Sequence, residues 1–385
     1  MVVERVLAGR RAPEVETVAP GDALGRVLAC EIRADRDYPP FDRSVRDGFA
    51  VRAEDLPGPL RIVGEVRAGQ VYPGEVGAGE AVETMTGAPV PKGADCVVMV
   101  EHTASEGGRV TVDRAYQAGD HISPRGAECR AGDVLMRAGV RVGYAGVALM
   151  ASVGMREATV YRRPRVAIVA TGDEIVADGV EPAAHQIRNS NSHSLAAQVR
   201  LAGGEPEILP VAPDELDATA ALIERGLEAD LLLLSGGVSA GRYDFVEQAL
   251  EWVGAEFYFD RVLIQPGQPL VFGRARGKFF FGLPGNPAST MVCFEVFARA
   301  AVELIGGMGE AELDLAEAAL AVDFRHRAGL TRFLPAVLSE GGITPVKWAG
   351  SGDIAAQARA NCLMVADPER PEYRRGERIS VLLRR

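Results

Sequence analysis

The chain has 385 residues, of which 47% are hydrophobic and 25% are charged, as in an ordinary globular protein, so wholesale disorder is excluded. Its length exceeds what one hydrophobic core usually serves, and we expect roughly two to four domains. The 44 glycines and 23 prolines argue against an all-helical bundle, and the net charge of −11 argues against nucleic acid as a partner.

The sequence predicts neither export nor membrane insertion. The first residues lack the apolar stretch of a signal peptide, and the longest aliphatic run, at 231–234, is far shorter than the roughly 20 residues of a membrane-spanning helix. The five cysteines lie far apart, without the spacing of a zinc site or a disulfide framework. We therefore expect a cytoplasmic protein with no membrane partner.

Near the start, apolar residues have the spacing of a short amphipathic helix. Ala23, Leu24, Val27 and Leu28 would share one face of it. Asp22 precedes them, and aspartate is a preferred helix N-cap. We therefore predict a short helix capped by Asp22.

A β-rich module is predicted next. Residues 35–130 hold short valine-rich runs, such as RIVGEV and DCVVMVE, between glycine, proline and aspartate turns. The segment GYAGVALMASVG, at 143–154, predicts one helix. We expect 1–34 and 131–162 to form a discontinuous N-terminal domain around the β insert.

From residue 163 the pattern changes to strands that alternate with helices. Strands are expected in RVAIVATGDEI, EILPV, DLLLLSGG, FYFDRVLI, PLVFG and KFFFGLPG. Helices are expected in SHSLAAQVRLAGG, in DELDATAALIERGLE and after Pro287. Because such alternation is typical of a parallel sheet, we predict that 163–309 form a doubly wound α/β domain.

The last part of the chain returns to short strands. LAVDF, RFLPAVL, ITPVKW and RISVLL are separated by glycine turns. We predict that 310–385 form a small C-terminal β-barrel domain.

Three loops with glycines directly follow predicted strands of the α/β domain, at 171–174, 235–239 and 282–287. Ligands of open parallel sheets bind beyond the carboxyl ends of the strands. Glycine lets backbone N–H groups approach a phosphate, and a helix that begins at Pro287 leaves N-terminal donors free for an anion. The sequence therefore predicts a phosphorylated ligand, and the absence of GxxxxGK[ST] excludes a P-loop nucleotidase.

Carboxylates fall close to the same loops. Glu174, Asp214 and Asp244 each follow a predicted strand or precede a helix. Carboxylates together with phosphate oxygens are typical ligands of Mg²⁺, whereas the five histidines form no cluster for zinc. The alternative role for Asp214 and Asp244 is capping of the helices that follow them.

A polar turn, PPFDRSVRDGFAV at 39–51, stands apart from this domain. It contains Asp47 followed by Gly48, a pair typical of a tight hairpin turn. Such a density of polar and turn-forming residues is also compatible with a site, and both interpretations stay open at this point.

In combination, these motifs resemble the molybdopterin molybdenumtransferases, whose relatives include the E domain of gephyrin. The resemblance spans nearly the whole chain and rests on ordered motifs: ALGRVLA, PPFDRSVRDGFAV, MTGAPVPKGADCVVMVE, ATGDEI, LLLLSGGVSAGRYD, IQPGQPLVFG, GLPGNPAS, GSGD and ANCLMV. It implies an elongated multidomain chain in which a molybdopterin-binding α/β domain is joined to all-β modules. It also implies a homodimer that inserts molybdate into adenylated molybdopterin, releases AMP with the help of Mg²⁺, and so completes the molybdenum cofactor.

The resemblance assigns roles to individual residues. The positions that match the family's catalytic residues are Asp47, Thr86, Glu174, Asp214 and Asp244, and those that would hold the metal are Glu174, Asp214 and Asp244. The positions implied for substrate binding are Ser235, Gly236, Gly237, Ser239, Pro266, Gly267, Gln268, Pro269, Pro284, Gly285, Asn286, Arg332 and Ser351. Of these, Arg332, Ser351 and Pro269 would hold molybdate. In the implied dimer, the insert with Asp47 and Thr86 reaches the α/β domain of the other subunit.

The chain departs from the family pattern at a few positions. Gln265 and Gln268 stand where many relatives have lysine, Ser123 where a basic residue is frequent, and Glu128 where aspartate is usual. Two cations expected near anionic ligands are therefore missing, and their loss would weaken binding by about 1 to 2 kcal/mol each. Arg125, Arg188, Arg242 and Arg261 are candidate replacements.

Two other functions remain as alternatives. One is an enzyme that adenylates molybdopterin, and the other is a pterin-binding scaffold that has lost catalysis because of the two glutamines. A separate molybdopterin adenylyltransferase would be a partner that delivers the substrate of the molybdate-inserting enzyme.

Overall fold

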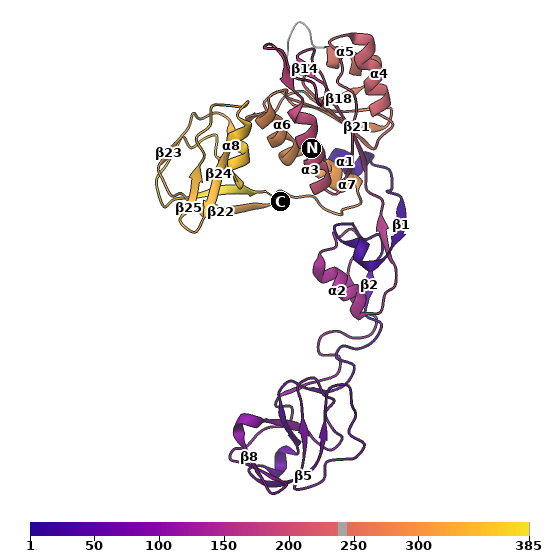
Figure 1. Ribbon diagram of the computed structural model, residues 1–385, viewed down its shortest axis with the longest axis vertical. Helices are drawn as coiled ribbons and strands as arrows, with labels where there is room; N and C mark the ends of the chain where they lie inside the picture. The colour runs from indigo at the N-terminus through magenta and orange to yellow at the C-terminus, as the bar shows by residue number, and fades with distance from the viewer. Residues whose placement is uncertain (238–244, 385) are drawn as a thin grey trace. The chain divides into compact units, whose positions relative to one another are not determined.

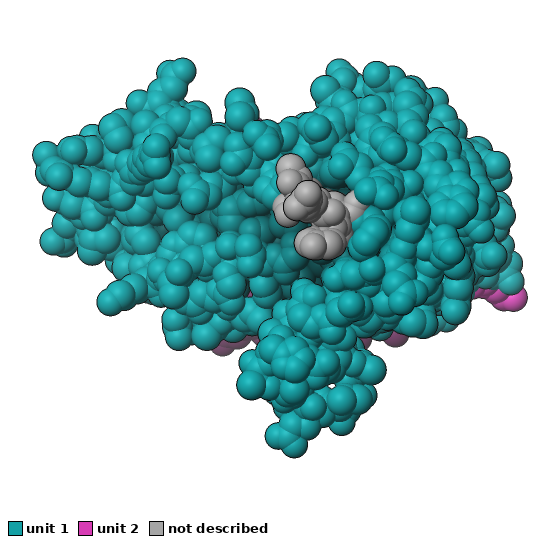
Figure 2. Space-filling view, turned by 90° about the horizontal axis from the view of Figure 1, so that it is seen from above, with its two compact units in different colours: residues 1–30, 138–143, 157–385 teal, residues 31–137, 144–156 magenta. Residues whose placement is uncertain are grey.

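The computed structural model describes residues 1–237 and 245–384 (Figure 1). The chain divides into two compact units (Figure 2). Unit 1 consists of Met1–Cys30, Ala138–Gly143 and Glu157–Arg385, and unit 2 of Glu31–Arg137 and Tyr144–Arg156. The sequence predicts four domains, whereas this division gives two units, so the boundaries of the four domains stay predictions. No helix in the described part of the chain is long and apolar enough to cross a membrane.

Unit 2 contains a six-stranded sheet with the order β7-β4-β6-β5-β9-β8. Its strands are β4 (Gly48–Val51), β5 (Gly58–Val66), β6 (Glu80–Thr84), β7 (Cys96–Met99), β8 (Thr103–Glu106) and β9 (Arg109–Val112). Neighbouring strands are antiparallel except β5 and β6. Alternate apolar residues of these strands, such as Phe49, Val51, Val98 and Val110, form the core, as the valine-rich runs predict.

Short elements complete unit 2. β2 (Ile32–Arg33) pairs with β11 (Val134–Met136), and β3 (Arg43–Ser44) pairs with β10 (Ile122–Ser123). The helix expected at 143–154 is confirmed as α2 (Tyr144–Ser152).

The start of unit 1 differs from the sequence prediction. The helix expected after Asp22 is wrong, because only a 3-10 turn forms at Pro20–Ala23. Gly25 then has a φ of +74°, and Leu28 donates its N–H to the carbonyl of Val140, so the segment continues in extended form. The apolar spacing of this segment therefore belongs to an extended chain that pairs with residues 140–142, not to a helix. Unpredicted elements flank it: α1 (Val2–Gly9), and β1 (Val15–Val18) paired with β12 (Ala158–Tyr161).

The α/β sheet of unit 1 has the order β16-β13-β17-β21-β20-β18. Its strands are β13 (Arg165–Ala170), β16 (Glu205–Ile208), β17 (Leu231–Ser235), β18 (Glu256–Phe259), β20 (Val271–Ala275) and β21 (Lys278–Leu283). The predicted parallel arrangement is confirmed for β16, β13, β17 and β21 but is wrong for β20, which runs antiparallel to both of its neighbours, β21 and β18. Arg276 and Gly277, both with positive φ, join β20 to β21 in a two-residue turn, which requires antiparallel strands.

Helices cover both faces of this sheet (Figure 1). On one face, α1, α3 (Ser190–Leu201), α6 (Pro287–Cys293), a π-helical turn (Phe294–Ala298) and α7 (Arg299–Ile305) bury residues such as Ile168 and Leu233. On the other, α4 (Leu216–Gly226) and α5 (Phe245–Trp252) bury their neighbours Val169 and Leu234. Because successive side chains point to opposite faces, continuous apolar strands fill two cores, and the doubly wound architecture is confirmed.

The C-terminal strands form a small barrel. They are β22 (Leu315–Ala319), β24 (Thr331–Ser339), β25 (Gly342–Pro345), β26 (Cys362–Ala366) and β28 (Arg378–Leu383). A bridge between Leu320 and Ile343 closes the ring from β22 to β25, and β19 (Ile264–Gln265) adds a short strand beside β24. The strand expected at LAVDF is misplaced, since β22 lies five residues earlier and Leu320–Phe324 mainly form a turn before β23 (Phe324–Arg325).

Candidate functional site

Three strand ends of the α/β sheet meet at its carboxyl edge. Thr171, after β13, donates its N–H to the carbonyl of Ser235 at the end of β17 over 3.0 Å. Gly236 donates its N–H to the carbonyl of Leu283 at the end of β21 over 3.1 Å. The structure therefore brings the three predicted loops together.

Glycines let these loops approach closely. Gly236 has a φ of +98°, and a Cβ atom there would lie 2.8 Å from the carbonyl oxygen of Thr171. A Cβ on Gly237, whose φ is +62°, would lie 2.5 Å from a methyl carbon of Val246. A Cβ on Gly285 would lie 3.6 Å from the Cα of Gly236. Larger residues at 236 and 237 would force the strand ends apart.

Unsatisfied polar atoms gather at the same edge. Asn191, in the first turn of α3, donates from Nδ2 to Ser235 Oγ over 2.9 Å and to the carbonyl of Gly285 over 2.8 Å. Asn191 Oδ1, Thr171 Oγ1 and Ser192 Oγ are buried without a hydrogen-bond partner in the described structure. Because native proteins rarely leave buried polar atoms unpaired, these atoms favour a ligand site. Our sequence prediction did not include Asn191, although the polar run NSNSHS at the start of this helix was a signal for it.

The predicted metal ligands lie in the adjacent loops. Gly172 donates its N–H to the carbonyl of Ala212, and Asp214 donates its N–H to Asp173 Oδ1 over 3.1 Å. A Cβ on Gly172 would lie 2.3 Å from Glu174 Oε2, so the Glu174 carboxylate folds back over this glycine. Asp214 is not the helix cap, because α4 has Glu215 at its N-cap. Its carboxylate is exposed and available to a ligand.

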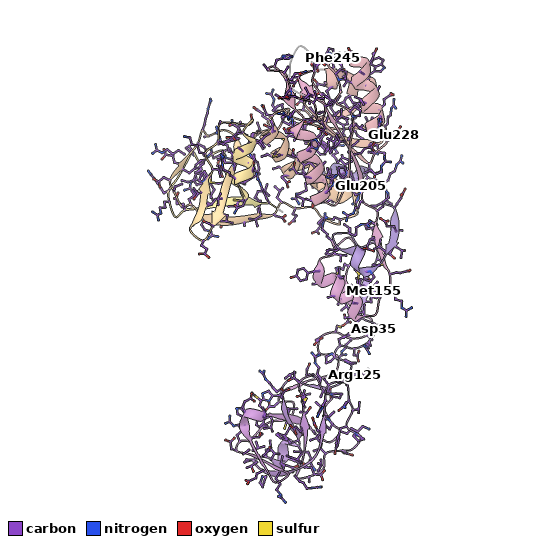
Figure 3. All side chains as sticks on the ribbon, in the orientation of Figure 1. Asp35, Arg125, Met155, Glu205, Glu228 and Phe245 are labelled. Carbon is purple, nitrogen blue, oxygen red and sulfur yellow. The ribbon has the colours of Figure 1, made fainter. Side chains whose placement is uncertain are left out.

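Two predicted residues, Ser239 and Asp244, lie outside the described residues. Phe245, at the start of α5, is the first described residue after them (Figure 3). Within the described residues no group of three or more His, Cys, Asp or Glu side chains could hold a metal ion. Glu174 and Asp214 nevertheless offer the oxygen atoms that Mg²⁺ prefers, and Mg²⁺ usually keeps water and phosphate oxygens as further ligands.

The loop at 265–269 packs against α6. A Cβ on Gly267, whose φ is +105°, would lie 2.3 Å from the Sγ atom of Cys293, which donates to the Gly267 carbonyl over 3.4 Å. Burial raises the pKa of the Cys293 thiol, which therefore stays protonated. Pro266 is buried, and Gln268 and Pro269 are half-buried. The Cys293 side chain thus holds the backbone of this loop against α6.

The C-terminal barrel contributes two predicted residues to the same region. β19 and β24 place Gln265 beside Arg332, whose Nε atom is buried without a partner in the described structure. The carbonyl of Ser351 accepts a hydrogen bond from the N–H of Ala288 over 2.9 Å, so the GSGD loop lies against the start of α6. Thr290 Oγ1 donates to the carbonyls of Pro284 and Asn286, which fixes the preceding loop. Arg332 and Ser351 are therefore next to the loops at 265–269 and 284–286.

In unit 2, the structure pairs Asp47 with Thr86. The N–H and hydroxyl groups of Thr86 both donate to Asp47 Oδ1, over 2.6 and 2.8 Å. These hydrogen bonds, first the backbone one and then that of the side chain, lower the pKa of Asp47. A Cβ on Gly48 would lie 1.8 Å from the carbonyl oxygen of Val98, so this turn needs glycine because of tertiary packing, beyond local hairpin geometry.

Two residues of unit 2 that differ from the family pattern, Ser123 and Glu128, lie close together around Arg43. Glu128 forms an ion pair with Arg43 over 2.6 Å, and Arg43 is aligned with Ser123 across β3 and β10. Arg125 (Figure 3) donates from Nε to Asp37 over 2.7 Å. This candidate replacement cation is therefore already paired within the fold.

Comparison with known proteins identifies the family. The model of the MoeA N-terminal region (domain I and II) matches residues 2–154, that of a probable molybdopterin binding domain matches residues 167–304, and that of the MoeA C-terminal region (domain IV) matches residues 317–383. The chain is 37% identical to the molybdopterin molybdenumtransferase of Bacillus subtilis, with 99% of this chain and 92% of that protein covered. It is 33% identical to the enzyme of the same name from Staphylococcus aureus (strain Mu50), with 99% and 94% covered.

Solved structures agree with this result. The crystal structure of a molybdopterin biosynthesis MoeA protein from Pyrococcus horikoshii has a TM-score of 0.83 at 28% identity, and the match covers 100% of this chain and 98% of that one. A second structure described as this protein has a TM-score of 0.76 at 31% identity, over 99% and 97% of the two chains. The chain belongs to the MoeA family of molybdopterin molybdenumtransferases.

Proposed function

We propose that this chain inserts molybdate into adenylated molybdopterin, with release of AMP, at the carboxyl edge of its α/β sheet. The observation that carries the proposal is the meeting of Thr171, Ser235 and Gly285 in one place, with buried polar atoms that the described protein leaves unpaired. The names of the relatives, molybdopterin molybdenumtransferases, agree with the chemistry of this edge.

The glycine-bearing loops would hold the phosphates and the pterin. Gly237 and Gly285 expose backbone close to the strand ends, where a phosphate can approach N–H groups. The hydroxyl groups of Thr171 and Ser235 add side-chain donors at the same edge. This combination suits an anionic, ring-bearing substrate better than a purely apolar one.

Glu174, Asp214 and Asp244 would hold Mg²⁺, with Asp244 outside the described residues. When bound, Mg²⁺ supplies positive charge to the phosphate oxygens of the bond that is hydrolysed. The exposed Asp214 carboxylate and the Glu174 carboxylate over Gly172 support this assignment.

Molybdate, the second substrate, would bind between the loop at 266–269 and the barrel. Arg332 has a buried, unpaired Nε atom in the described structure, and Ser351 lies at the start of α6. Arginine and hydroxyl groups are suitable donors for a dianion. Gln265 and Gln268 can donate hydrogen bonds there without adding charge.

Asp47 and Thr86 would complete the site in a homodimer, with the β insert of one subunit serving the α/β domain of the other. Their mutual hydrogen bonds give Asp47 a fixed orientation and an ionised carboxylate, as a substrate-positioning group needs. Mixing Asp47→Ala with Asp214→Ala subunits would then restore about a quarter of wild-type activity after random exchange. No recovery after proven exchange would contradict the shared site.

The reaction is proposed to be cytoplasmic, and a molybdopterin adenylyltransferase would supply the substrate. The five cysteines are free thiols, which agrees with a reducing compartment.

The decisive test measures AMP release from adenylated molybdopterin with Mg²⁺, with and without molybdate. We expect molybdate-dependent release that falls by about a hundredfold or more in Glu174→Gln and Asp214→Asn. Glu317→Gln, which breaks an exposed ion pair of the barrel, is the matched control and should retain activity. Formation of pyrophosphate from ATP and molybdopterin would instead indicate an adenylating enzyme.

A variant tests the alternative of an inactive scaffold. Gln268→Lys restores a cation at the proposed molybdate site. Release of AMP by this variant but not by the wild type would mean that the neutral glutamine has disabled the site. Activity in the wild type would show that the two glutamines suffice.

A further inference from the structure

The Asn191 side chain joins two loops of the proposed substrate site. It is 9% exposed and donates from Nδ2 to the Ser235 hydroxyl at the end of β17 and to the carbonyl of Gly285 after β21. Both Nδ2 hydrogens are therefore used, one on each loop. No other side chain in the described structure donates to both loops.

The carbonyl of Gly285 fixes which end of the amide faces the loops. A carbonyl oxygen can only accept, so the Asn191 oxygen cannot occupy the position 2.8 Å away from it. Because Nδ2 must lie there, Ser235 Oγ is the acceptor in the second bond. The hydrogen of the Ser235 hydroxyl is left over, and it donates to no acceptor in the described part of the chain.

The amide also leaves a fixed acceptor. Asn191 Oδ1 is buried and unpaired within the described structure, as is the hydroxyl of Thr171, which can donate or accept. Ser235 is 1% exposed and Thr171 is 6% exposed, so both groups are largely shielded from bulk water. The edge therefore offers one directed donor, one directed acceptor and one adaptable hydroxyl.

We propose that Asn191 is a positioning residue, which ties the two loops together and directs the Ser235 hydroxyl toward an acceptor oxygen of the bound substrate. This inference rests on the proposed function. Phosphate oxygens only accept hydrogen bonds, so they match the Ser235 donor and are repelled by Asn191 Oδ1. That oxygen instead selects a donor, such as an amino or hydroxyl group of the same substrate.

A double-mutant cycle tests the role of Asn191. Anaerobic calorimetry measures the binding of adenylated molybdopterin to the wild-type chain, Asn191→Ala, Ser235→Ala and the double variant. We expect roughly tenfold weaker binding in each single variant and still roughly tenfold, not hundredfold, in the double variant. Independent effects, or unchanged binding in Asn191→Ala, would overturn the inference while leaving the proposed function intact.

Two variants separate this role from general loss of structure. Asn191→Asp keeps the shape but places a carboxylate oxygen against the Gly285 carbonyl, and we expect it to bind at least as weakly as Asn191→Ala. Asn361→Ala is the matched control, because it also removes two hydrogen bonds of an asparagine, both to Leu338 of the barrel. We expect unchanged binding in this control.

A measurement without ligand makes the outcome independent of the proposed function. Hydrogen exchange of peptides covering 231–237 and 283–288 should be faster in Asn191→Ala than in Asn361→Ala, because the side chain that joins them is gone. Unchanged exchange would overturn the tying of the loops. If the wild type binds no adenylated molybdopterin, the proposed function is wrong, and this exchange result alone decides whether Asn191 joins the loops.

Discussion

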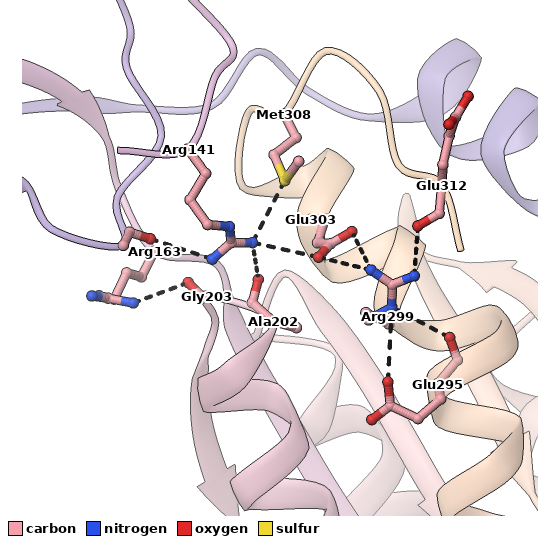
Figure 4. Close-up of polar contacts among 10 residues, drawn as sticks. Arg141, Arg163, Ala202, Gly203, Glu295, Arg299, Glu303, Met308 and Glu312 are labelled. Atoms are coloured by element: carbon pink, nitrogen blue, oxygen red, sulfur yellow. Dashed lines mark hydrogen bonds and ion pairs between the residues drawn. The ribbon is translucent and has the colours of Figure 1, made fainter. Parts of the chain in front are cut away.

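Two buried polar clusters of unit 1 differ in how their polar groups are paired. The first, which we call the α7 ion cluster, centres on Arg299 and Glu303, which are 4% and 1% exposed (Figure 4). Arg299 Nη1 lies 3.2 Å from both carboxylate oxygens of Glu303, and its Nη2 donates to the carbonyl of Glu312 over 2.6 Å. Arg141 adds a second cation, 3.6 Å from Glu303.

Among the described residues, the second cluster, at the carboxyl edge of the sheet, holds no such charge pair. Asn191 Oδ1 and Thr171 Oγ1 are buried there without partners in the described structure. A buried charge must be compensated inside the fold, because an isolated one costs several kcal/mol. Unpaired neutral groups cost less, so a ligand site can retain them. The α7 ion cluster thus pairs its charges within the fold, whereas the sheet edge keeps unpaired hydrogen-bonding groups, as the proposed ligand site requires.

The largest effect is expected from breaking the α7 ion cluster. Glu303→Leu removes the buried carboxylate at 3.2 Å from Arg299 Nη1 and leaves the guanidinium only the longer, 3.8 Å pair with Glu295, so it should lower the free energy of unfolding by about 3 kcal/mol. Urea denaturation measures this loss. Glu317→Ala, in an exposed ion pair with Arg378, should cost less than about 1 kcal/mol. Equal losses in the two variants would contradict the structural role of the buried pair.

A smaller effect is expected at the sheet edge. In Gly236→Ala, the positive φ and the contact with Thr171 should together lower the free energy of unfolding by about 2 to 3 kcal/mol. Gly254→Ala is the control, since Gly254 also has positive φ but no atom within 4 Å of its Cβ position, and it should cost about 1 kcal/mol. If both variants lost equal stability, the close approach of the strand ends would be unimportant.

A gain in stability is expected from removing an unpaired group. Ser192 is fully buried, and its hydroxyl has no partner in the described structure. Ser192→Ala should therefore raise the free energy of unfolding by up to about 1 kcal/mol. Thermal denaturation is the measurement. A loss of more than this amount would mean that the hydroxyl is satisfied, and it would remove one member of the unpaired set.

The smallest effect concerns Asp47 in unit 2, whose carboxylate is already paired with Thr86. Thr86→Val removes the side-chain hydrogen bond and should raise the pKa of Asp47 toward its ordinary value, while the backbone bond keeps part of the lowering. Nuclear magnetic resonance of the labelled carboxyl carbon measures the titration. An unchanged pKa would contradict the contribution of the hydroxyl.

The same variant has a pH dependence with a definite sign. A carboxyl group whose pKa is lowered on folding adds stability above its unfolded pKa, near 4, and loses it as the pH falls through the folded pKa. The stability difference between wild type and Thr86→Val should therefore be full at neutral pH and shrink in acid. Urea denaturation of the two proteins at neutral and at acidic pH measures this difference in the free energy of unfolding.

Much of the fold was predictable from local patterns. The apolar runs of β13 and β17 and the helical stretches of α3 and α4 each indicated one element, and their alternation predicted the doubly wound domain. The helix predicted after Asp22 was wrong. Its apolar residues have helical spacing, but the segment is extended and forms backbone hydrogen bonds with residues near Val140. The antiparallel β20 was missed, since its turn at Arg276 and Gly277 has little sequence signal beyond one glycine.

The candidate site was predictable to a similar degree. The meeting of the glycine loops followed from sequence position, because the carboxyl ends of parallel strands share one edge, whereas the metal-binding roles of Glu174 and Asp214 stay predictions. The role of Asn191 was missed, since it depends on bonds to residues 44 and 94 positions away. The hydrogen bonding of Asp47 with Thr86 also could not be predicted from local patterns, because the two residues lie 39 positions apart.

The sequence by itself determined the family, the order of strands and helices, and the loops where a phosphorylated ligand is expected. Those features depend on periodicity and on short motifs, which act through neighbouring residues. Only the tertiary structure decided which polar atoms are paired, how the barrel closes between Leu320 and Ile343, and which amide joins Ser235 to Gly285. The physical reason is that a hydrogen bond requires two groups within about 3 Å, and only the folded chain brings distant residues that close.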